Sequence, residues 1–259
     1  MNASARRVCV AGALVLLTVV LSSESLSAQR GRGAGAGGAA PPTPRQAAPV
    51  DLTGWWVSVV FEDWRFRMLT PPKGDVAGVP VNQEGRTVAG AWDPAKDAAA
   101  GEECRAFGAP GVMRLPGRLH ITWQDDRTLK VETDAGTQTR LLTFGQAPAQ
   151  TTRTWQGSSV AAWDGVQGGG DAGPRWGSLR VVTTQLRPGY LRKNGVPYSE
   201  NAVLTEYFDL QSGPGGSTWL TVTSIVNDPK YLTQEFITST DFKKEPNGSK
   251  WSATPCTAG

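Results

Sequence analysis

The chain contains one histidine, His120, and histidine is the side chain whose ordinary pKa suits proton transfer near neutral pH. General acid–base catalysis would pair it with a carboxylate or a phenol, and the candidates are Glu200, Glu206 and Tyr198. A single histidine excludes metal sites that need two imidazole ligands, as in zinc peptidases and facial-triad iron enzymes. We therefore expect no metal and no cofactor. The alternative for His120 is a structural role on a strand.

The spacing of the two glutamates limits what they can do together. If Glu200 and Glu206 lay on one regular strand, their carboxylates would be about 20 Å apart. Paired-carboxylate hydrolases need about 5 to 10 Å between the two groups. Each glutamate would therefore need a partner from a neighbouring strand. The alternative is that both are solvated charges or members of cross-strand ion pairs.

A second group of side chains could hold a small molecule. Arg114, Arg192 and Tyr198 offer hydrogen-bond donors that would orient a polar group of a ligand. The ten tryptophans either form an aromatic ligand site or fill and cap a small hydrophobic core. The residues that we expect at a ligand site are Arg114, His120, Trp155, Arg192, Tyr198 and Glu206.

The N-terminus predicts export. Arg6 and Arg7 precede an apolar run, Val8 to Leu21, which is too short to span a bilayer comfortably and ends in small and polar residues. This pattern is typical of a signal peptide, and we expect cleavage after Ala28. The mature chain would then have no transmembrane segment and would be periplasmic or secreted.

Cleavage would remove Cys9 and leave two cysteines, Cys104 and Cys256. An even pair in an oxidising compartment predicts a disulfide. In the loop-entropy description a closed loop of this length contributes about 4 to 5 kcal/mol. The alternative, a pair of redox-active thiols, lacks the Cys-x-x-Cys spacing that lowers a thiol pKa.

Residues 29–50 are rich in Gly, Ala and Pro and have almost no large apolar side chains, which predicts a flexible spacer. Gly33, Gly35 and Gly38 match a dinucleotide-binding spacing, but no strand precedes them, so we attribute the match to composition. Residues 51–259 are of a size that fits a single β domain.

Short alternating or apolar runs separated by turn residues indicate strands throughout this domain. Residues 88–100 predict one short helix. We expect an all-β fold, an antiparallel, lipocalin-like barrel of about 8 to 10 strands closed on itself. The expected strands are 55–61, 119–124, 129–133, 137–144, 159–163, 179–186, 202–210, 219–226 and 233–240.

The chain resembles two groups of known proteins, and the first resemblance supports a barrel. The segment 52–56, Leu-Thr-Gly-Trp-Trp, resembles the Gly-x-Trp opening of lipocalin-like, or calycin, barrels, in which the tryptophan plugs the closed end. Further along, the chain resembles an uncharacterised family of exported bacterial proteins, which implies export but no particular activity. The segments that carry this second resemblance are 155–160, 163–164, 179–184, 199–201, 205–208 and 228–231.

The chain departs from that family's pattern at three points. Tyr198 stands where the family has a histidine before Ser-Glu, and Tyr207 replaces an arginine after Glu206. The family's Asp-Gly-Arg has no counterpart here. If those residues serve chemistry in the family, this member binds differently or does not react.

Three function classes remain open. The first is an exported, lipocalin-like barrel that binds a small, partly apolar or aromatic ligand. The second is a lyase, isomerase or hydrolase that uses general acid–base catalysis on the same barrel. The third is an envelope interaction protein without a pocket. A net charge of +3, with basic and acidic residues interspersed, predicts no nucleic-acid partner, and the oligomeric state stays open.

Overall fold

The computed structural model describes residues 40–259 of the chain. The expected signal peptide, its cleavage site after Ala28, Cys9 and residues 29–39 of the expected spacer lie outside the described residues.

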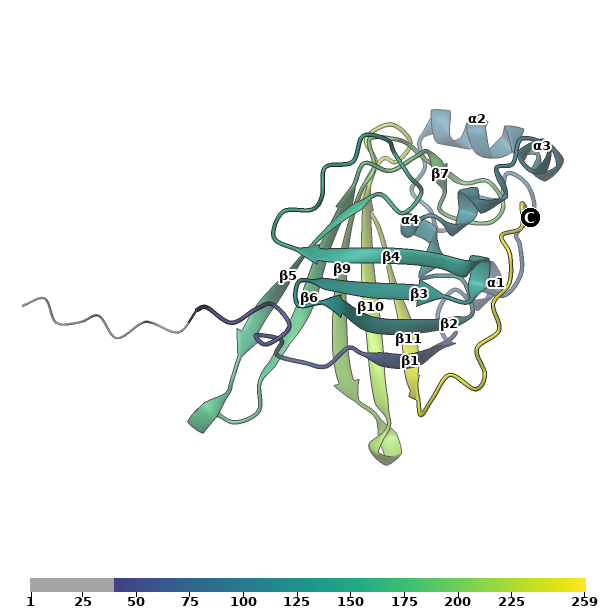
Figure 1. Cartoon of the computed structure of the whole chain (residues 1–259). Coiled ribbons are helices and arrows are strands. Elements are labelled where there is room, and N and C mark those ends of the chain that lie inside the picture. The colour runs from purple at the N-terminus through teal and green to yellow at the C-terminus, as the bar shows by residue number, and fades with distance from the viewer. Residues whose placement is uncertain (1–39) are drawn as a thin grey trace, which may run out of the picture. The chain divides into compact units, whose positions relative to one another are not determined.

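Nine strands form a closed barrel with the neighbour order β1-β11-β10-β9-β6-β5-β4-β3-β2, so that β2 returns to β1 (Figure 1). Two further short strands, β7 and β8, form a separate hairpin. The strands are β1 (Gly54–Val59), β2 (Arg118–Asp125), β3 (Thr128–Thr133), β4 (Gln138–Phe144), β5 (Ser158–Gln167), β6 (Trp176–Thr184), β7 (Gly189–Tyr190), β8 (Pro197–Tyr198), β9 (Val203–Ser212), β10 (Thr218–Asn227) and β11 (Phe236–Glu245).

The all-β barrel and each of its nine expected strands are confirmed, with shifted boundaries. The expectation that all strands are antiparallel was wrong, because β4 and β5 pair in parallel. The reason is one of parity. Strand directions cannot alternate all the way around a ring with an odd number of members, so a closed barrel of nine strands must contain at least one parallel pair.

The barrel interior is filled by apolar side chains from all nine strands. Along β10, for example, Leu220 and Val222 point inward and alternate with half-buried residues, as the two-residue period of a strand requires. Trp56 is fully buried in the same cluster, and its indole Nε1 donates to the Leu52 carbonyl at 3.0 Å. Trp56, the tryptophan of the Gly-x-Trp segment, therefore packs inside the barrel.

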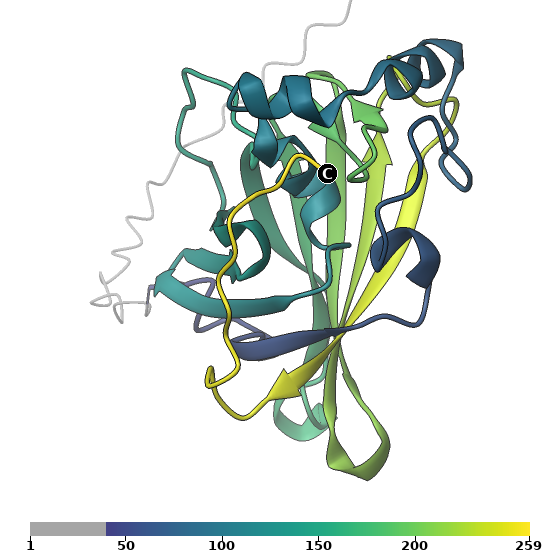
Figure 2. The ribbon, with the colours of Figure 1, turned by 90° about the vertical axis from the view of Figure 1, so that its right-hand side faces the viewer.

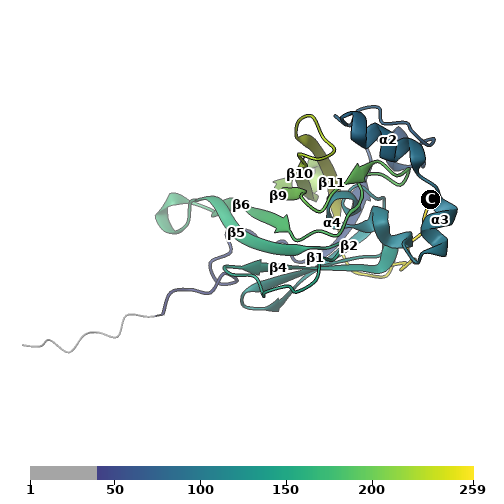
Figure 3. The same ribbon diagram turned by 90° about the horizontal axis from the view of Figure 1, so that it is seen from above.

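Helices gather beside one end of the barrel, where Figures 1 and 3 show α2, α3 and α4 together with the β7–β8 hairpin. We call this part of the domain the cap; it consists of residues 60–117 and 185–202. The helices are α1 (Trp64–Arg67), α2 (Gln83–Ala91), α3 (Pro94–Ala99) and α4 (Ala109–Val112), with 3-10 helices at Glu103–Phe107, Ala135–Thr137, Gly170–Ala172 and Pro214–Gly216.

The single helix expected over residues 88–100 is in fact two. Asn82 caps α2 by accepting from the Gly85 amide at 2.9 Å, so this helix begins well before residue 88. Trp92 is extended, Asp93 caps the next helix, and Pro94 opens it. A new cap followed by proline therefore divides the predicted helix.

A second apolar cluster joins the cap to the barrel. It combines cap residues such as Val79, Leu191 and Tyr198 with Leu204 of β9 and Phe236 of β11. The β7–β8 hairpin is tied to the segment after α1 because Asn194 Nδ2 donates to the carbonyls of Pro72 and Asp75 at 3.0 and 2.8 Å. The cap is thus continuous with the folded domain.

Residues 41–50, expected to belong to the spacer, contact the barrel. The Trp163 indole donates to the Pro44 carbonyl at 2.8 Å, and the Arg45 amide donates to the Asp126 carbonyl at 3.2 Å. Pro49 is buried and Val50 packs against the barrel core. A composition rule for flexible segments does not detect such contacts, because they depend on backbone groups and on residues that are remote in sequence.

Candidate functional site

A cavity of about 440 Å³ lies between the cap and the C-terminal tail, residues 246–259. Its walls come from α1 and the residues after it, from the segment around α4, from Ala135 in the turn before β4, from the loop of the β7–β8 hairpin, and from the tail. Figure 2 shows this side of the molecule, with the tail running from the end of β11 along the cap. The cavity therefore lies outside the packed interior of the barrel.

Three buried arginines line the cavity, Arg67, Arg114 and Arg192. They come from α1, from the turn after α4, and from the hairpin loop, three segments that are far apart in the sequence. Their charged groups are removed from water, which is costly unless each is paired. The partners of each arginine therefore decide what the cavity can bind.

Arg67 has a full set of partners. Its Nη1 pairs with Glu62, its Nη2 donates to Ser58 Oγ at 3.0 Å, and its Nε donates to the Arg114 carbonyl at 2.9 Å. Burial lowers the pKa of Arg67, and Arg114 adds to this, while Glu62 and Asp63 oppose it. Arg67 therefore links β1 to the segment after α4 through hydrogen bonds.

Arg114 is only partly satisfied. Its Nη2 donates to Asp63 Oδ2 at 2.9 Å, whereas Nη1 is buried and has no hydrogen-bond partner among the described residues. The guanidinium also lies 5.6 Å from the centre of the Phe236 ring. Just before it in the chain, Gly111 lets α4 pack closely on neighbouring backbone, since a Cβ there would lie 2.9 Å from the carbonyl oxygens of Ala106 and Tyr190.

Arg192 is the least satisfied of the three. Its Nη1 donates to the Ala77 carbonyl at 2.7 Å, but Nε and Nη2 have no partner in residues 40–259. Its guanidinium stacks on Phe66 at 4.1 Å from the ring centre. Burial, with the neighbouring Arg114 charge, lowers the pKa of Arg192 to about 10, so it still carries its proton at neutral pH.

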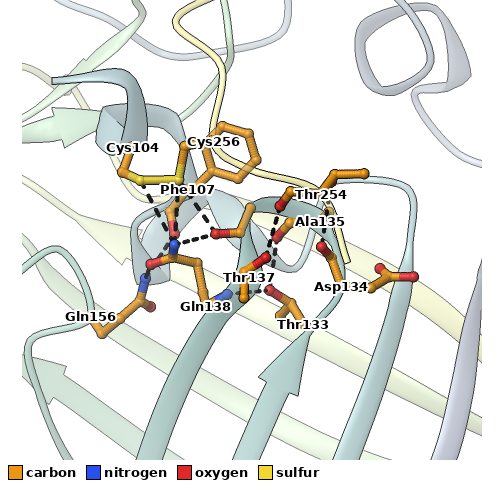
Figure 4. The surroundings of a disulfide bond; sticks show 11 residues. Cys104, Phe107, Thr133, Asp134, Ala135, Thr137, Gln138, Gln156, Thr254 and Cys256 are labelled. Carbon is orange, nitrogen blue, oxygen red and sulfur yellow. Dashed lines mark hydrogen bonds between the residues drawn. A yellow bond between two sulfur atoms is a disulfide. The ribbon is translucent and has the colours of Figure 1, made fainter. Parts of the chain in front are cut away.

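The C-terminal tail that forms one wall is fixed covalently. Cys104 and Cys256 form the expected disulfide (Figure 4). Gln138 Nε2 lies 3.4 Å from Cys256 Sγ and donates to the Gly136 carbonyl at 2.6 Å. The Thr254 amide donates to the Asp134 carbonyl at 2.9 Å. The bond and these contacts hold the tail against the 3-10 turn at Ala135–Thr137.

His120 lies away from this cavity, on the outer face of β2. The register of β1 and β2 places it opposite Trp55, and the two rings stack at 3.7 Å with 5° between their planes. Its Nδ1 is 3.2 Å from Glu132 Oε2, and Lys130 pairs with the same carboxylate at 3.0 Å. The inward positions of β2 are taken by Leu119 and Ile121. His120 therefore does not face the barrel interior.

Glu206 points into the barrel and is fully buried in a two-point ion pair with Arg140 of β4. Arg140 also reaches Thr183, whose hydroxyl bonds to Ser159 at 2.8 Å. Along β9 this pair lies between Leu204 of the cap cluster and Phe208 of the barrel cluster. Glu206 therefore belongs to a buried polar layer between the cap cluster and the barrel cluster.

The remaining expected site residues lie in different places. Tyr198 is buried in the β7–β8 hairpin, and its hydroxyl has no partner among the described residues. Trp155 packs under Arg187, whose guanidinium lies 4.5 Å from its ring centre. Glu200 is at the surface, 4.0 Å from Lys230. Only Arg114 and Arg192 of the expected ligand residues line the cavity.

Sequence reasoning missed two residues. Arg67 is not among the expected site residues, and nothing in a four-residue helix indicates that its side chain is buried. Arg140 could have been found, because it occupies an inward position of a strand that continues with Leu142 and Phe144. An arginine at such a position requires a buried carboxylate nearby.

None of the ten tryptophans lines this cavity, and Trp56, Trp123 and Trp163 instead pack in or against the barrel core.

In residues 40–259, no cluster of His, Cys, Asp and Glu side chains is arranged to hold a metal ion. The helices of this region are all too short or too polar to cross a bilayer. Searches against protein-family models, curated proteins and solved structures find no match.

Proposed function

We propose that this protein is exported and binds a small molecule in the cavity between the cap and the C-terminal tail. The observation that carries the proposal is the cavity itself, about 440 Å³ in volume, in which apolar walls surround a few buried donors. This combination is typical of small-molecule sites. The N-terminal segment expected to be a signal peptide and the Cys104–Cys256 disulfide support export.

The arrangement of side chains favours binding over acid–base catalysis. Among the described residues lining the cavity there is no histidine, carboxylate or tyrosine. His120, Glu206 and Tyr198 lie on the outer face of β2, inside the barrel and in the hairpin, so they do not converge. The cavity therefore offers donors and apolar contacts to a ligand, which are the elements of recognition.

The test uses the neutral apolar fluorophore Nile red on the folded, disulfide-bonded protein. We expect saturable binding with one site. Ala135→Trp and Thr70→Trp place a large side chain on two different walls of the cavity and should abolish it. Ala99→Trp, on an exposed position of α3, is the matched control and should bind as the parent does.

Two outcomes decide the proposal. Loss of binding in both cavity variants with retention in the Ala99→Trp control supports the cavity as the site, and native mass spectrometry of protein purified from its own host should then show a bound molecule that Ala135→Trp lacks. Equal Nile red binding in all four proteins overturns the proposal, since the dye would then sit elsewhere, for example on the exposed side chains of Phe61 and Trp64.

A further inference from the structure

The charge on the cavity wall is of one sign. Four basic residues line it, Arg67, Arg114, Arg192 and Lys193, and the described lining residues include no acidic one. The carboxylates of Glu62 and Asp63 pair with two of these arginines but do not line the cavity. A ligand that enters the cavity therefore meets positive groups.

Pairing of these charges leaves one buried cation without a counter-ion. Glu62 compensates Arg67, and Asp63 compensates Arg114. For Arg192 no carboxylate oxygen lies within 4.0 Å in the described part of the chain, although the residue is only 4% exposed. Burial and the like charge of Arg114 disfavour the Arg192 cation, whereas Asp63 and Asp75 favour it only from beyond ion-pair distance.

Hydrogen-bond donors are left over at the same place. Arg114 Nη1 and Arg192 Nε and Nη2 are buried and unpartnered within residues 40–259. A buried guanidinium donor without an acceptor costs free energy, and such groups are rare in folded proteins unless they serve a function. All three belong to side chains that line the cavity, so the unpartnered donors lie in the wall that a ligand would contact.

We infer that the cavity binds an organic monoanion, whose charged group pairs with Arg192 and Arg114 and whose apolar body lies in the rest of the cavity. This inference rests on the proposed function and specifies its ligand class. One negative charge neutralises the one uncompensated guanidinium, and a carboxylate or sulfonate matches the forked donors of arginine.

The remaining walls fit the apolar part of such a molecule. Phe66, Phe107 and Leu115 line the cavity, and Met68 and Leu69, 57% and 65% exposed, stand at its rim. Large apolar side chains exposed together at the mouth of a pocket are typical of a binding surface. The ligand is therefore amphipathic, with its charge inward against the arginines and its apolar body toward the rim.

The experiment compares ligands of equal length that differ in charge. The fluorescent probe is 8-anilinonaphthalene-1-sulfonate, an aromatic monoanion, bound to the folded wild-type protein. We expect decanoate to displace it at a concentration at least tenfold lower than 1-decanol, because only the carboxylate pairs with the guanidinium groups. Equal displacement by decanoate and decanol overturns the inference.

A variant series locates the charge. Arg192→Gln should weaken the binding of the sulfonate probe at least tenfold and leave the affinity for neutral Nile red within about twofold. Arg192→Lys, which keeps the charge but not the fork, should restore part of the loss. Arg86→Gln removes a positive charge from an exposed position of α2 and should change neither affinity.

Failure of the inference differs from failure of the proposed function. If Nile red binds in the cavity but Arg192→Gln leaves the sulfonate affinity unchanged, the cavity is a site and its ligand class is wrong. If neither probe responds to Ala135→Trp, the cavity is not a site and both proposals fall. Circular dichroism of each variant confirms that the comparison is made on folded protein.

Discussion

Tyr198 buries its hydroxyl group against the backbone of two glycines. The ring packs against Gly108 and Gly189, and a Cβ added at either glycine would come within 2.5 Å of the hydroxyl oxygen. The hydroxyl has no acceptor or donor among residues 40–259. Burial raises the pKa of Tyr198 well above its usual range.

Removing this hydroxyl should stabilise the protein. We expect Tyr198→Phe to raise the free energy of unfolding by about 1 kcal/mol, because a buried polar group without a partner is lost. The comparison is Tyr190→Phe, which removes the hydroxyl that donates to Asp97 at 2.8 Å and should cost about 1 kcal/mol. Urea denaturation at neutral pH measures both, and a destabilised Tyr198→Phe would show that the hydroxyl has a partner.

The two tyrosines also predict an alkaline limit of stability. Burial raises the pKa of both phenols in the folded state, with the Asp97 hydrogen bond adding to the effect at Tyr190. Their contribution is fully present below pH ~10, the unfolded value, and is lost as pH rises above it, since the unfolded chain releases protons that the folded chain retains. Unfolding free energies measured between pH 8 and 11 should show that the parent loses stability relative to Tyr198→Phe only above that value.

Glu206 should matter for folding. Glu206→Gln leaves the Arg140 guanidinium buried without its carboxylate and should cost about 3 to 5 kcal/mol. The double substitution Arg140→Met with Glu206→Leu removes both charges and should recover most of that loss. Arg187→Gln, which breaks the partly exposed pair with Glu102, is the control and should cost less than about 1 kcal/mol. A Glu206→Gln protein as stable as the parent would contradict the buried pair.

At the scale of elements, the C-terminal tail depends on contacts that are remote in sequence. It has no helix or strand of its own after β11, and the Thr254 amide bonds its backbone to the Asp134 carbonyl, in the turn between β3 and β4. The disulfide joins it to the 3-10 helix Glu103–Phe107 across 152 residues. The position of the tail therefore depends mainly on one covalent bond, the disulfide.

We expect Cys104→Ser with Cys256→Ser to lower the free energy of unfolding by about 4 to 5 kcal/mol. Amide exchange should accelerate in residues 250–259, and Nile red affinity should fall because one wall of the cavity becomes mobile. Hydrogen exchange with mass spectrometry measures the first effect and fluorescence titration the second. Unchanged protection of the tail would mean that its hydrogen bonds suffice to hold it.

The strands were predictable from sequence because each one carries its own signal. In β10 the buried residues alternate strictly with half-buried ones, and this period identifies a strand without any knowledge of its neighbours. The helices α1 and α4 have four residues each, barely more than a turn, and no period can be read from so short a segment. The cap was therefore the part that sequence patterns described least well.

At the scale of the whole molecule, closure depends on one short parallel contact. The β4–β5 pair has three residue partners in register, from Leu142–Ser159 to Phe144–Ala161, whereas β9 and β10 share ten. Parallel pairing is also slightly less stable per residue than antiparallel pairing. This pair is the place where we expect the barrel to open first.

Amide exchange measured by NMR tests that expectation. Backbone amides of β4 and β5 that face each other should exchange about tenfold faster, or more, than those between β9 and β10. The β5–β6 amides serve as an internal control, because β5 is antiparallel to β6 over eight registered partners. Equal protection across the three pairs would show that the barrel opens as one unit.

The cavity could be predicted only in part. Arg114 and Arg192 were expected as donors to a polar group of a ligand, and both line the cavity. Its location could not be foreseen, because its walls come from five segments, including the turn at Ala135, that meet only after the cap, hairpin and tail have folded. The sequence favoured a site within the barrel, and the interior is instead filled by residues such as Phe208 and Phe242.

The bond between Cys104 and Cys256 encloses every barrel strand except β1 in one covalent ring. A protease that cuts once within that ring, for example in the glycine-rich tip at Gly168–Gly170 between β5 and β6, leaves two fragments that are still joined through sulfur. The fragments would run together on a gel without reductant and separate with it. In an oxidising compartment, where the disulfide persists, such a nicked molecule would remain covalently joined and its strands would remain paired with their neighbours.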